Sequence, residues 1–572
     1  MIRVLINRIR YFFILISLAL PPGLHAQNLE NLKSEKPFSI TGTLGGTLSF
    51  YHVSGKQASR KPFVWLLTGS PTLSVYGISF PFSFTVSEEQ RDFRQPFNKF
   101  GVSPYYKWIK LNLGYRSVTY SPYTLAGHSM LGAGAELSPG NFRFGFMYGR
   151  VLKAVDPNQQ TPALDHSQVL TPSYERRAWS MKLGYGTVKN YADLIFLKGW
   201  DDPNSLSLDS TNRSLTPAEN FITSFVTHQQ FARKFHFDLQ LSQSLYTDDL
   251  NAETPDTSSH QLLDLFSGLY RTNGTTGTSS AFESSLGYGG TMFSLNLHFK
   301  RIAPGYRSMG AYFFQNDLRN ITLAPSLRLG QQKYTLGGSI GFQRDNLNNE
   351  LPATTHRTIG SLTFNAAPSQ VYNANITYSN YDMGQSAGAS AVDSLYEISQ
   401  TTQNLAIGQN VNITGKALTQ NIMLNFNFQK LKDKNSNTAN LNSFNSSTLM
   451  LNYMLFFINA GLNLSLNFNY TLYKLQNSKN RILGPGAVIT KSLLENKLSL
   501  SFADNYFKNS ITTTGGNDRI NGVNRVSLRA GLKPSAHHRF YVRYYLNKSK
   551  AITSNIIPFT EQKGDIGYVY SF

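Results

Sequence analysis

Residues 38–50 read FSITGTLGGTLSF, and the alternation in this stretch decides the fold. Apolar side chains share one parity (Phe38, Ile40, Leu44, Leu48 and Phe50), while serine and threonine dominate the other. Neighbouring side chains of a β-strand point to opposite faces, so the segment has one apolar and one polar face. It is long enough to cross a bilayer as a tilted strand, which needs roughly 9 to 11 residues, whereas an average globular strand has about 5 or 6.

The same alternation recurs at residues 79–86, 235–242, 293–300, 422–429 and 462–470. Aromatic residues gather near the ends of such segments, as in the interfacial girdles of membrane barrels. A soluble β-sandwich also alternates, but its strands are shorter. Counting back from the C-terminus, with short inner turns and longer outer loops, predicts an all-β fold. It is a transmembrane antiparallel β-barrel of about 24 strands (range 20–26), with both termini on the inner side.

The composition agrees with a barrel and with neither common alternative. Only 15% of the 572 residues are charged, where roughly a quarter is usual for a soluble domain. The mean hydropathy is nevertheless negative, at −0.27, and after the N-terminal segment there is no apolar run of about 20 residues that would form a membrane helix. The chain has no cysteine, which excludes disulfides, a thiolate metal site and a lipid-modified cysteine.

The first 26 residues have the features of an export signal peptide. Arg3, Arg8 and Arg10 form a basic start, residues 11–20 are apolar, and Ala26 precedes the expected cleavage site. We expect residues 1–26 to be the signal, residues 27–36 a short linker, and residues 37–572 the barrel.

The C-terminal strand carries a family resemblance. Ile566, Tyr568, Tyr570 and Phe572 alternate up to the last residue. Here the chain resembles the outer-membrane β-barrel superfamily of Gram-negative bacteria, whose members typically end in an aromatic residue on an amphipathic strand. The resemblance implies the cell outer membrane as the location and outer-membrane lipid as a partner. It also implies that these four residues form the signal read by the barrel-insertion machinery. TonB-dependent transporters resemble this barrel in size but carry an N-terminal plug, which residues 27–36 are too short to form.

No constellation for catalysis is visible in the sequence. Among 11 histidines there is no nucleophile-elbow, HExxH or phosphate-loop pattern, so we expect no enzyme, no cofactor and no metal site. A pI near 9.7 would suit nucleic-acid binding, but an exported chain does not meet that partner.

The excess of positive charge suggests a function for the lumen. The formal net charge is +20, or +17 without the three arginines of the signal. Three acidic residues, Glu136, Asp238 and Glu283, fall on the lumen-facing parity, and rows of arginine and lysine favour anions in pores. Alternatively, these cations pair with loop carboxylates or meet lipopolysaccharide phosphates at the outer rim. The basic residues of lumen-facing parity are Lys110, Arg116, Arg143, Lys182, Lys300, Arg328, Arg525, Arg529 and Arg543.

Two functions remain open. The first is an outer-membrane channel for small solutes that prefers anions. The second is a partner-gated conduit or docking platform for the secretion or attachment of surface proteins, with a secreted or surface protein as partner. The charged stretch 87–101 is expected at the inner rim, as a solvated turn or as a segment that enters the lumen or contacts a partner.

Overall fold

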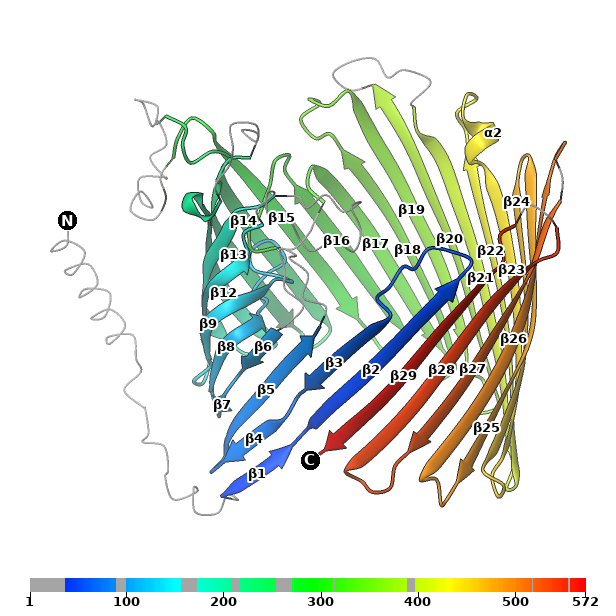
Figure 1. Cartoon of the computed structure of the whole chain (residues 1–572). Helices are drawn as coiled ribbons and strands as arrows, with labels where there is room; N and C mark the ends of the chain where they lie inside the picture. The colour runs from blue at the N-terminus through cyan, green and yellow to red at the C-terminus, as the bar shows by residue number, and fades with distance from the viewer. Residues whose placement is uncertain are drawn as a thin grey trace.

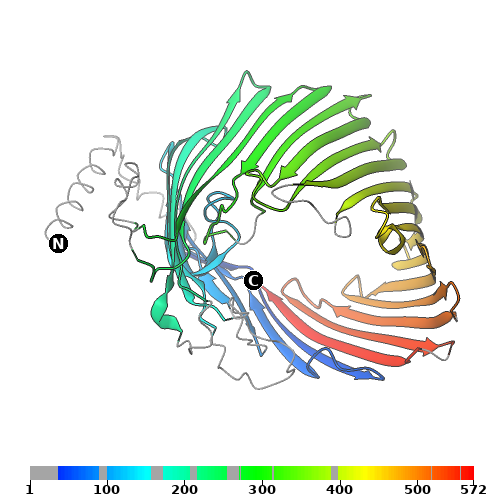
Figure 2. The same cartoon turned by 90° about the horizontal axis from the view of Figure 1, so that it is seen from above.

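The computed structural model describes residues 37–88, 99–155, 172–206, 215–253, 270, 272–311, 315–387, 397–516, 518–553 and 556–572. The expected signal peptide and linker, residues 1–36, lie outside these ranges. The described chain forms one sheet that closes on itself as a barrel (Figures 1 and 2). Helical structure in these ranges includes the short α2 (Ala439–Asn442) and the 3-10 turn η2 (Pro203–Ser205). A search of the described helices found none with both the length and the apolar character needed to span a bilayer.

Twenty-nine strand segments build the sheet, and neighbouring segments pair antiparallel. The first ten are β1 (Phe38–Thr41), β2 (Thr43–Ser54), β3 (Phe63–Gly69), β4 (Thr72–Val75), β5 (Ile78–Ser87), β6 (Lys99–Val102), β7 (Tyr105–Tyr106), β8 (Ile109–Ser117), β9 (Ser129–Leu137) and β10 (Phe142–Leu152). The next ten are β11 (Glu175–Gly186), β12 (Asn190–Asp202), β13 (Glu219–Phe231), β14 (Phe235–Thr247), β15 (Thr276–Gly289), β16 (Phe293–Ile302), β17 (Leu318–Leu329), β18 (Tyr334–Asp345), β19 (Ala353–Ala366) and β20 (Tyr372–Ala387). The last nine are β21 (Ser399–Thr414), β22 (Leu418–Asp433), β23 (Phe444–Phe457), β24 (Leu462–Leu475), β25 (Ser478–Leu493), β26 (Leu498–Thr513), β27 (Arg519–Leu532), β28 (His538–Ala551) and β29 (Phe559–Ser571).

Three wall strands are each interrupted once, so the 29 segments make 26 strands of the barrel wall (29 less 3). The interruptions separate β1 from β2, β3 from β4, and β6 from β7. At the first of them, Gly42 has a φ of +115°, and a Cβ there would lie 2.2 Å from the carbonyl oxygen of Ser70. Only glycine fits this close approach of two backbones. The number 26 confirms the predicted range of 20–26.

The two strands beyond the expected 24 come from hairpins near the N-terminus. One turns at Tyr76 and Gly77 between β4 and β5, and the other turns at Lys107 between β7 and β8. Tyr76 and Lys107 have φ values of 47° and 51°, a conformation that bulky residues rarely adopt. Gly77, with a φ of 81°, is a usual turn former and marks the first reversal, whereas Lys107 is not, so the sequence gives little sign of the second.

The first hairpin also overturns the expected position of residues 87–101. Strand β5 runs away from the rim that holds the start of β1 and the end of β29, so Ser87 points toward the opposite, outer rim (Figure 1). The assignment of this stretch to the inner rim is therefore wrong. Residues 89–98 themselves lie outside the described ranges.

The short turns at 138–141, 188–190, 330–332, 494–496 and 533–537 join consecutive strands at the inner rim, as the count from the C-terminus requires. The first strand begins at this rim and the last strand finishes there. The long connections therefore lie at the opposite rim.

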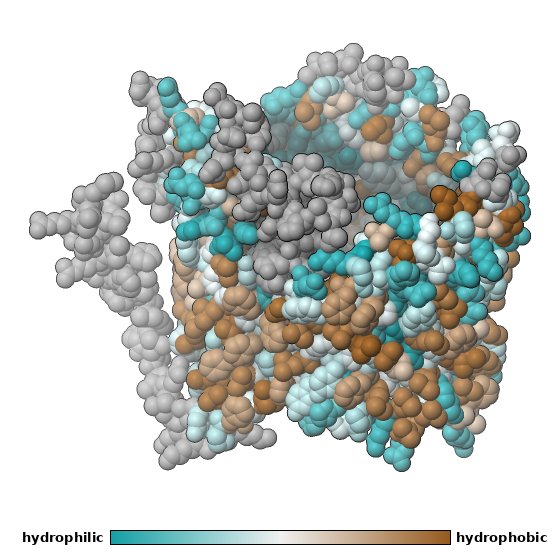
Figure 3. All heavy atoms as spheres, in the orientation of Figure 1, coloured by the Kyte–Doolittle hydropathy of each residue, from teal (hydrophilic) through white to brown (hydrophobic). Residues whose placement is uncertain are grey.

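The alternation sorts apolar side chains to the outside of the wall. Leu48, Ile489 and Phe502 are 42%, 45% and 45% exposed although they are large and apolar. Such side chains gather, in brown, over the lower part of the face shown in Figure 3, below a more polar upper rim. On β14, Phe235 and Leu241 are likewise exposed. A belt of this kind faces lipid, so the wall is a transmembrane barrel.

The barrel closes between β2 and β29, where Leu48 lies opposite Ile566. The amide of Phe572 donates to the carbonyl oxygen of Gly42 at 2.9 Å, and the rings of Tyr570 and Phe572 lie 4.9 Å apart. The expected insertion signal is therefore also the closing seam. Its recognition by the insertion machinery stays a prediction.

Candidate functional site

Two outer connections fold into the barrel and pack together. We call residues 118–128 and 303–311 the lumen lobe. Figure 2 shows chain inside the ring, next to the cyan and green strands. The amide of Ala126 donates to the carbonyl oxygen of Gly310 at 2.9 Å. The hydroxyl of Tyr306 donates to the carbonyl oxygen of Tyr123 at 3.0 Å, and both tyrosines are 1% exposed. Both tyrosines belong to a buried cluster with Ala281 and Ile302 of the wall, so the lobe packs against itself and against the barrel.

The lobe is attached to the wall strands behind it. The amide of Met309 donates to the side-chain oxygen of Asn220 on β13 at 3.0 Å. The hydroxyl of Ser244 on β14 donates to the carbonyl oxygen of Arg307 at 2.8 Å. A Cβ at Gly199 on β12 would lie 2.8 Å from Met309, so glycine lets the lobe approach closely. The lobe consequently covers part of the wall formed by β10 to β16.

The expected lumen cations near this lobe have acidic or aromatic neighbours, and two of them, Lys110 and Arg143, form ion pairs. Lys110 pairs with Glu136 at 2.9 Å. Lys182 lies over the ring of Tyr120 at 5.2 Å. Lys300 lies opposite Glu283 in the register of β15 and β16. On this side of the lumen, ion pairs with Glu136 and Asp193 therefore offset part of the positive charge.

Arg143 forms an ion pair that bridges two strands. Its guanidinium donates two bonds to the carboxylate of Asp193, at 2.8 and 2.9 Å, and it stacks on Tyr191 at 4.0 Å. The pair spans Gly184 of the intervening strand, where a Cβ would lie 1.9 Å from the carboxylate. Glycine at this position makes the bridge between non-adjacent strands possible.

Replacing Asp193 by Ala should destabilise the barrel by about 3–5 kcal/mol, because it leaves the Arg143 guanidinium without its partner in a largely buried site. The side chains of Asp193 and Arg143 are 5% and 24% exposed. Unfolding in urea, followed by tryptophan fluorescence, measures the change. The double replacement Arg143→Met with Asp193→Leu should cost much less. An equal loss in both variants would contradict the assignment.

Two other expected cations make polar contacts to uncharged groups. Arg116 donates to the hydroxyl of Ser83 at 2.6 Å and to the carbonyl oxygen of Pro81 at 3.1 Å. Arg328 donates to the carbonyl oxygen of Gly290 at 3.3 Å, next to an inner turn. The contact of Arg116 crosses the intervening strand β6 to reach β5, and that of Arg328 ties β17 to a nearby turn.

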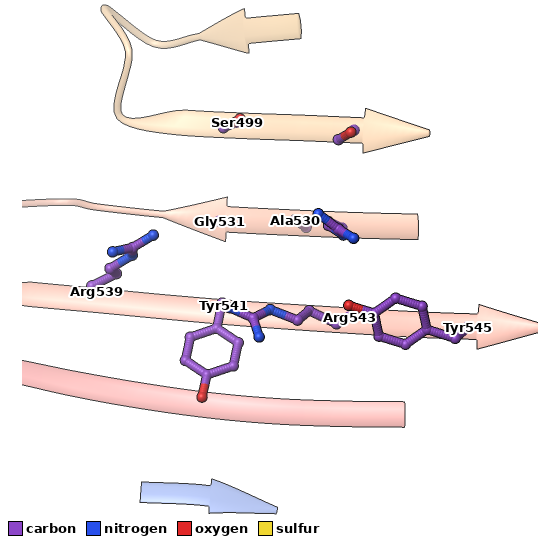
Figure 4. Close-up of a pocket in the computed structure, with 9 residues that line it drawn as sticks. Ser499, Ala530, Gly531, Arg539, Tyr541, Arg543 and Tyr545 are labelled. Atoms are coloured by element: carbon purple, nitrogen blue, oxygen red, sulfur yellow. The ribbon is translucent and has the colours of Figure 1, made fainter. Parts of the chain in front are cut away.

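The opposite wall, β26 to β28, holds a different arrangement. Arg529, Arg539 and Arg543 line a pocket of about 500 Å³ together with Tyr541 and Tyr545. Figure 4 shows the residues of β28 in a line along the strand. Arg529 and Arg543 lie directly opposite each other in the register. We call Arg529, Arg539 and Arg543 the arginine wall.

No carboxylate in the described part of the chain pairs with the arginine wall. Asp565, which lies opposite Arg543 in the register, accepts instead from Ser49 at 2.7 Å and contacts Lys563 at 3.3 Å. The guanidinium groups of Arg543 and Arg529 lie 4.6 and 5.6 Å from the rings of Tyr541 and Tyr545. Aromatic faces support the cations without neutralising them.

The last expected cation, Arg525, continues the row toward the outer rim and lies 4.9 Å from the ring of Phe507. Arg539 was missed by the sequence analysis because it follows an inner turn closely. Its parity, shared with Tyr541 and Arg543, is the signal that would have identified it.

The lumen shows no sign of a metal centre in the residues that the structure covers, where no group of three or more potential ligands gathers. His228 and His298 instead each contact a single carboxylate, Asp238 at 2.5 Å and Glu283 at 2.9 Å. These contacts account for the other two acidic residues expected in the lumen.

No protein-family model and no curated protein matches the chain. Among solved structures, it is similar to the FrpB iron transporter from Neisseria meningitidis (F3-3 variant), at 12% identity over 96% of this chain and 83% of that chain, with a TM-score of 0.38. It is similar to OccK2 (OpdF) from Pseudomonas aeruginosa in complex with glucuronate, at 10% identity over 94% and 98% of the two chains and a TM-score of 0.29. It is also similar to the P pilus usher (PapC) translocation pore, at 10% identity over 93% and 99% and a TM-score of 0.37.

The geometry of the chain itself defines its class. A closed antiparallel barrel with an apolar outer belt and a polar lumen is the architecture of outer-membrane β-barrels. This protein is an outer-membrane β-barrel, as the resemblance in its last strand implied. With 26 wall strands, its lumen is wider than wall side chains alone can fill, which is the property of a channel.

Proposed function

We propose that the protein is a channel for small solutes that prefers anions, with the arginine wall supplying the preference. The observation that carries this proposal is the lack of a carboxylate partner for Arg529, Arg539 and Arg543 among the described residues. Rows of arginine in a pore favour anions. Beside the lumen lobe, Lys110 and Arg143 are paired with carboxylates, so the arginine wall differs from them in having no such partner among the described residues.

The physical effect depends on ionic strength. A cleft with charge of one sign raises the local concentration of oppositely charged solutes. At about 0.1 M salt the screening length is about 10 Å, so the arginine wall acts across part of the lumen, whereas at about 1 M it is about 3 Å. Anion preference should therefore be strong in dilute salt and fade in concentrated salt.

Purified protein in a planar bilayer tests the proposal. With a potassium chloride gradient across the membrane, the reversal potential should have the sign of chloride preference, and its magnitude should fall as both solutions are made more concentrated. A reversal potential that indicates equal or greater cation passage in dilute salt would overturn the anion preference.

The second candidate is a partner-gated conduit or docking platform for secreted or surface proteins. The strand number favours it, because simple porins have about 16 to 18 strands and this barrel has 26. A purified barrel that stays closed in the bilayer and co-purifies with one large surface protein would support this function in place of the channel.

A further inference from the structure

Four adjacent strands carry cations at positions that face one another on the outside of the barrel. Arg301 on β16 lies opposite Arg319 on β17, Arg319 lies opposite Arg344 on β18, and Arg344 lies opposite His356 on β19. Opposed residues of antiparallel strands have Cα atoms about 4.5–5.5 Å apart. We call Arg301, Arg319 and Arg344, with His356 at the end, the outer cation row.

The outer cation row lies at the edge of the lipid-facing belt. Each arginine points to the same face of its strand as an exposed apolar residue. The side chains of Leu297, Ile321 and Phe342 are 44%, 42% and 54% exposed. These residues lie closer to the inner rim, because β16 and β18 run outward and β17 runs inward. The row therefore begins where the apolar belt ends, at the level of lipid headgroups.

No carboxylate in the described residues forms an ion pair with the row. Arg344 donates to the side-chain oxygen of Asn349 at 2.7 Å, while its Nε is buried without a partner in the described chain. The carboxylate of the adjacent Asp345 contacts Arg357 at 3.8 Å. Asp317 accepts from the backbone amides of residues 346 and 347. The nearby acids thus have other partners.

Like charges placed directly opposite each other destabilise a sheet, so three neighbouring arginines point to a bound anion. We propose that the outer cation row binds the phosphate groups of lipid A, the phosphorylated glycolipid of the outer leaflet. Arginine binds phosphate through two parallel hydrogen bonds, and a row of three spans more than one phosphate oxygen. The proposal is independent of the transport function, because these side chains face away from the lumen.

A second band of cations supports a lipid as the ligand. On β22, β24, β25, β26 and β28, the apolar alternation ends near the outer rim in basic residues of the same outward parity. No ion pair to them occurs within the described ranges. Positive charge at one height on many strands matches a layer of phosphorylated lipid headgroups. A compact soluble ligand would contact only a few of these strands. These residues are Lys430, Lys432, Lys474, Lys479, Arg481, Lys508, Lys548 and Lys550.

The experiment is native mass spectrometry of the full barrel, purified in detergent free of lipopolysaccharide and titrated with lipid A or with dephosphorylated lipid A. Wild-type protein should bind the phosphorylated form about tenfold more tightly, as expected for charge-assisted contacts. The triple variant R301Q/R319Q/R344Q should lose most of this difference. The matched control R529Q/R539Q/R543Q removes the same charge from the lumen and should retain it.

Three results would overturn the proposal. The first is equal binding of both lipids by the wild type, and the second is an unchanged difference in the outer triple variant. The third is displacement of lipid A by inorganic phosphate at equal concentration, which would assign the row to a free anion. Heat-modifiable migration in gels reports folding of each variant. If the triple variant does not fold, the single variants R301Q and R319Q, at two exposed positions, should each weaken binding of phosphorylated lipid A, and unchanged binding in both would reject the site.

Discussion

Replacing Arg529, Arg539 and Arg543 together by glutamine should lower the anion-to-cation permeability ratio by about tenfold in dilute salt. The three side chains line one pocket, and glutamine removes the charges while keeping much of the side-chain volume. Reversal potentials across a salt gradient measure the ratio. The substitution should have little effect near 1 M salt, because the screening length there is only about 3 Å.

Two control variants separate charge from shape in this measurement. The triple lysine replacement of the same arginines keeps the charge and should keep most of the preference. The variant R301Q/R319Q/R344Q removes three charges from the outside and should leave the ratio unchanged. An unchanged ratio in the lumen triple variant would show that the arginine wall does not select the ions that pass.

Replacing Tyr123 and Tyr306 together by alanine should release the lumen lobe and increase the single-channel conductance. Both rings are 1% exposed, and they contact each other with centroids 6.0 Å apart. Truncation of a buried aromatic side chain costs about 3–5 kcal/mol, so the packing of the lobe should fail before that of the wall. Single-channel recording and urea unfolding measure the two effects.

A milder variant provides the control for this prediction. Tyr306→Phe keeps the ring but removes the hydrogen bond to the carbonyl oxygen of Tyr123, which should cost about 1 kcal/mol and leave the conductance near its wild-type value. Unchanged conductance in the double alanine variant would show that the lobe does not restrict the pore.

The barrel could be predicted from the sequence because the alternation has a period of two, which is a local property. Parity alone placed residues such as Arg529 and Arg543 on the same face of neighbouring strands. The count was two strands short. The first missed turn contains one glycine, Gly77, beside Tyr76, and the second is at Lys107, which has a φ of 51°, where glycine or asparagine would have indicated a turn.

The charge pattern of the lumen could not be predicted in the same way, because pairing depends on the register between strands. Arg143 contacts Asp193 across Gly184, and no local sequence feature of the three strands predicts this contact. Asp565 lies opposite Arg543 but contacts Ser49 and Lys563 instead. The lumen lobe was also missed, since its two segments look like ordinary surface loops until their contacts are known.

The bond between Tyr306 and Tyr123 also has a consequence for how the barrel assembles. It joins residues 183 positions apart, and the intervening chain contains strands β9 to β16. Contacts between distant parts of a chain form late, because the chain between them must be ordered first. We therefore expect the lobe to settle only after those strands have paired, as a late step of assembly.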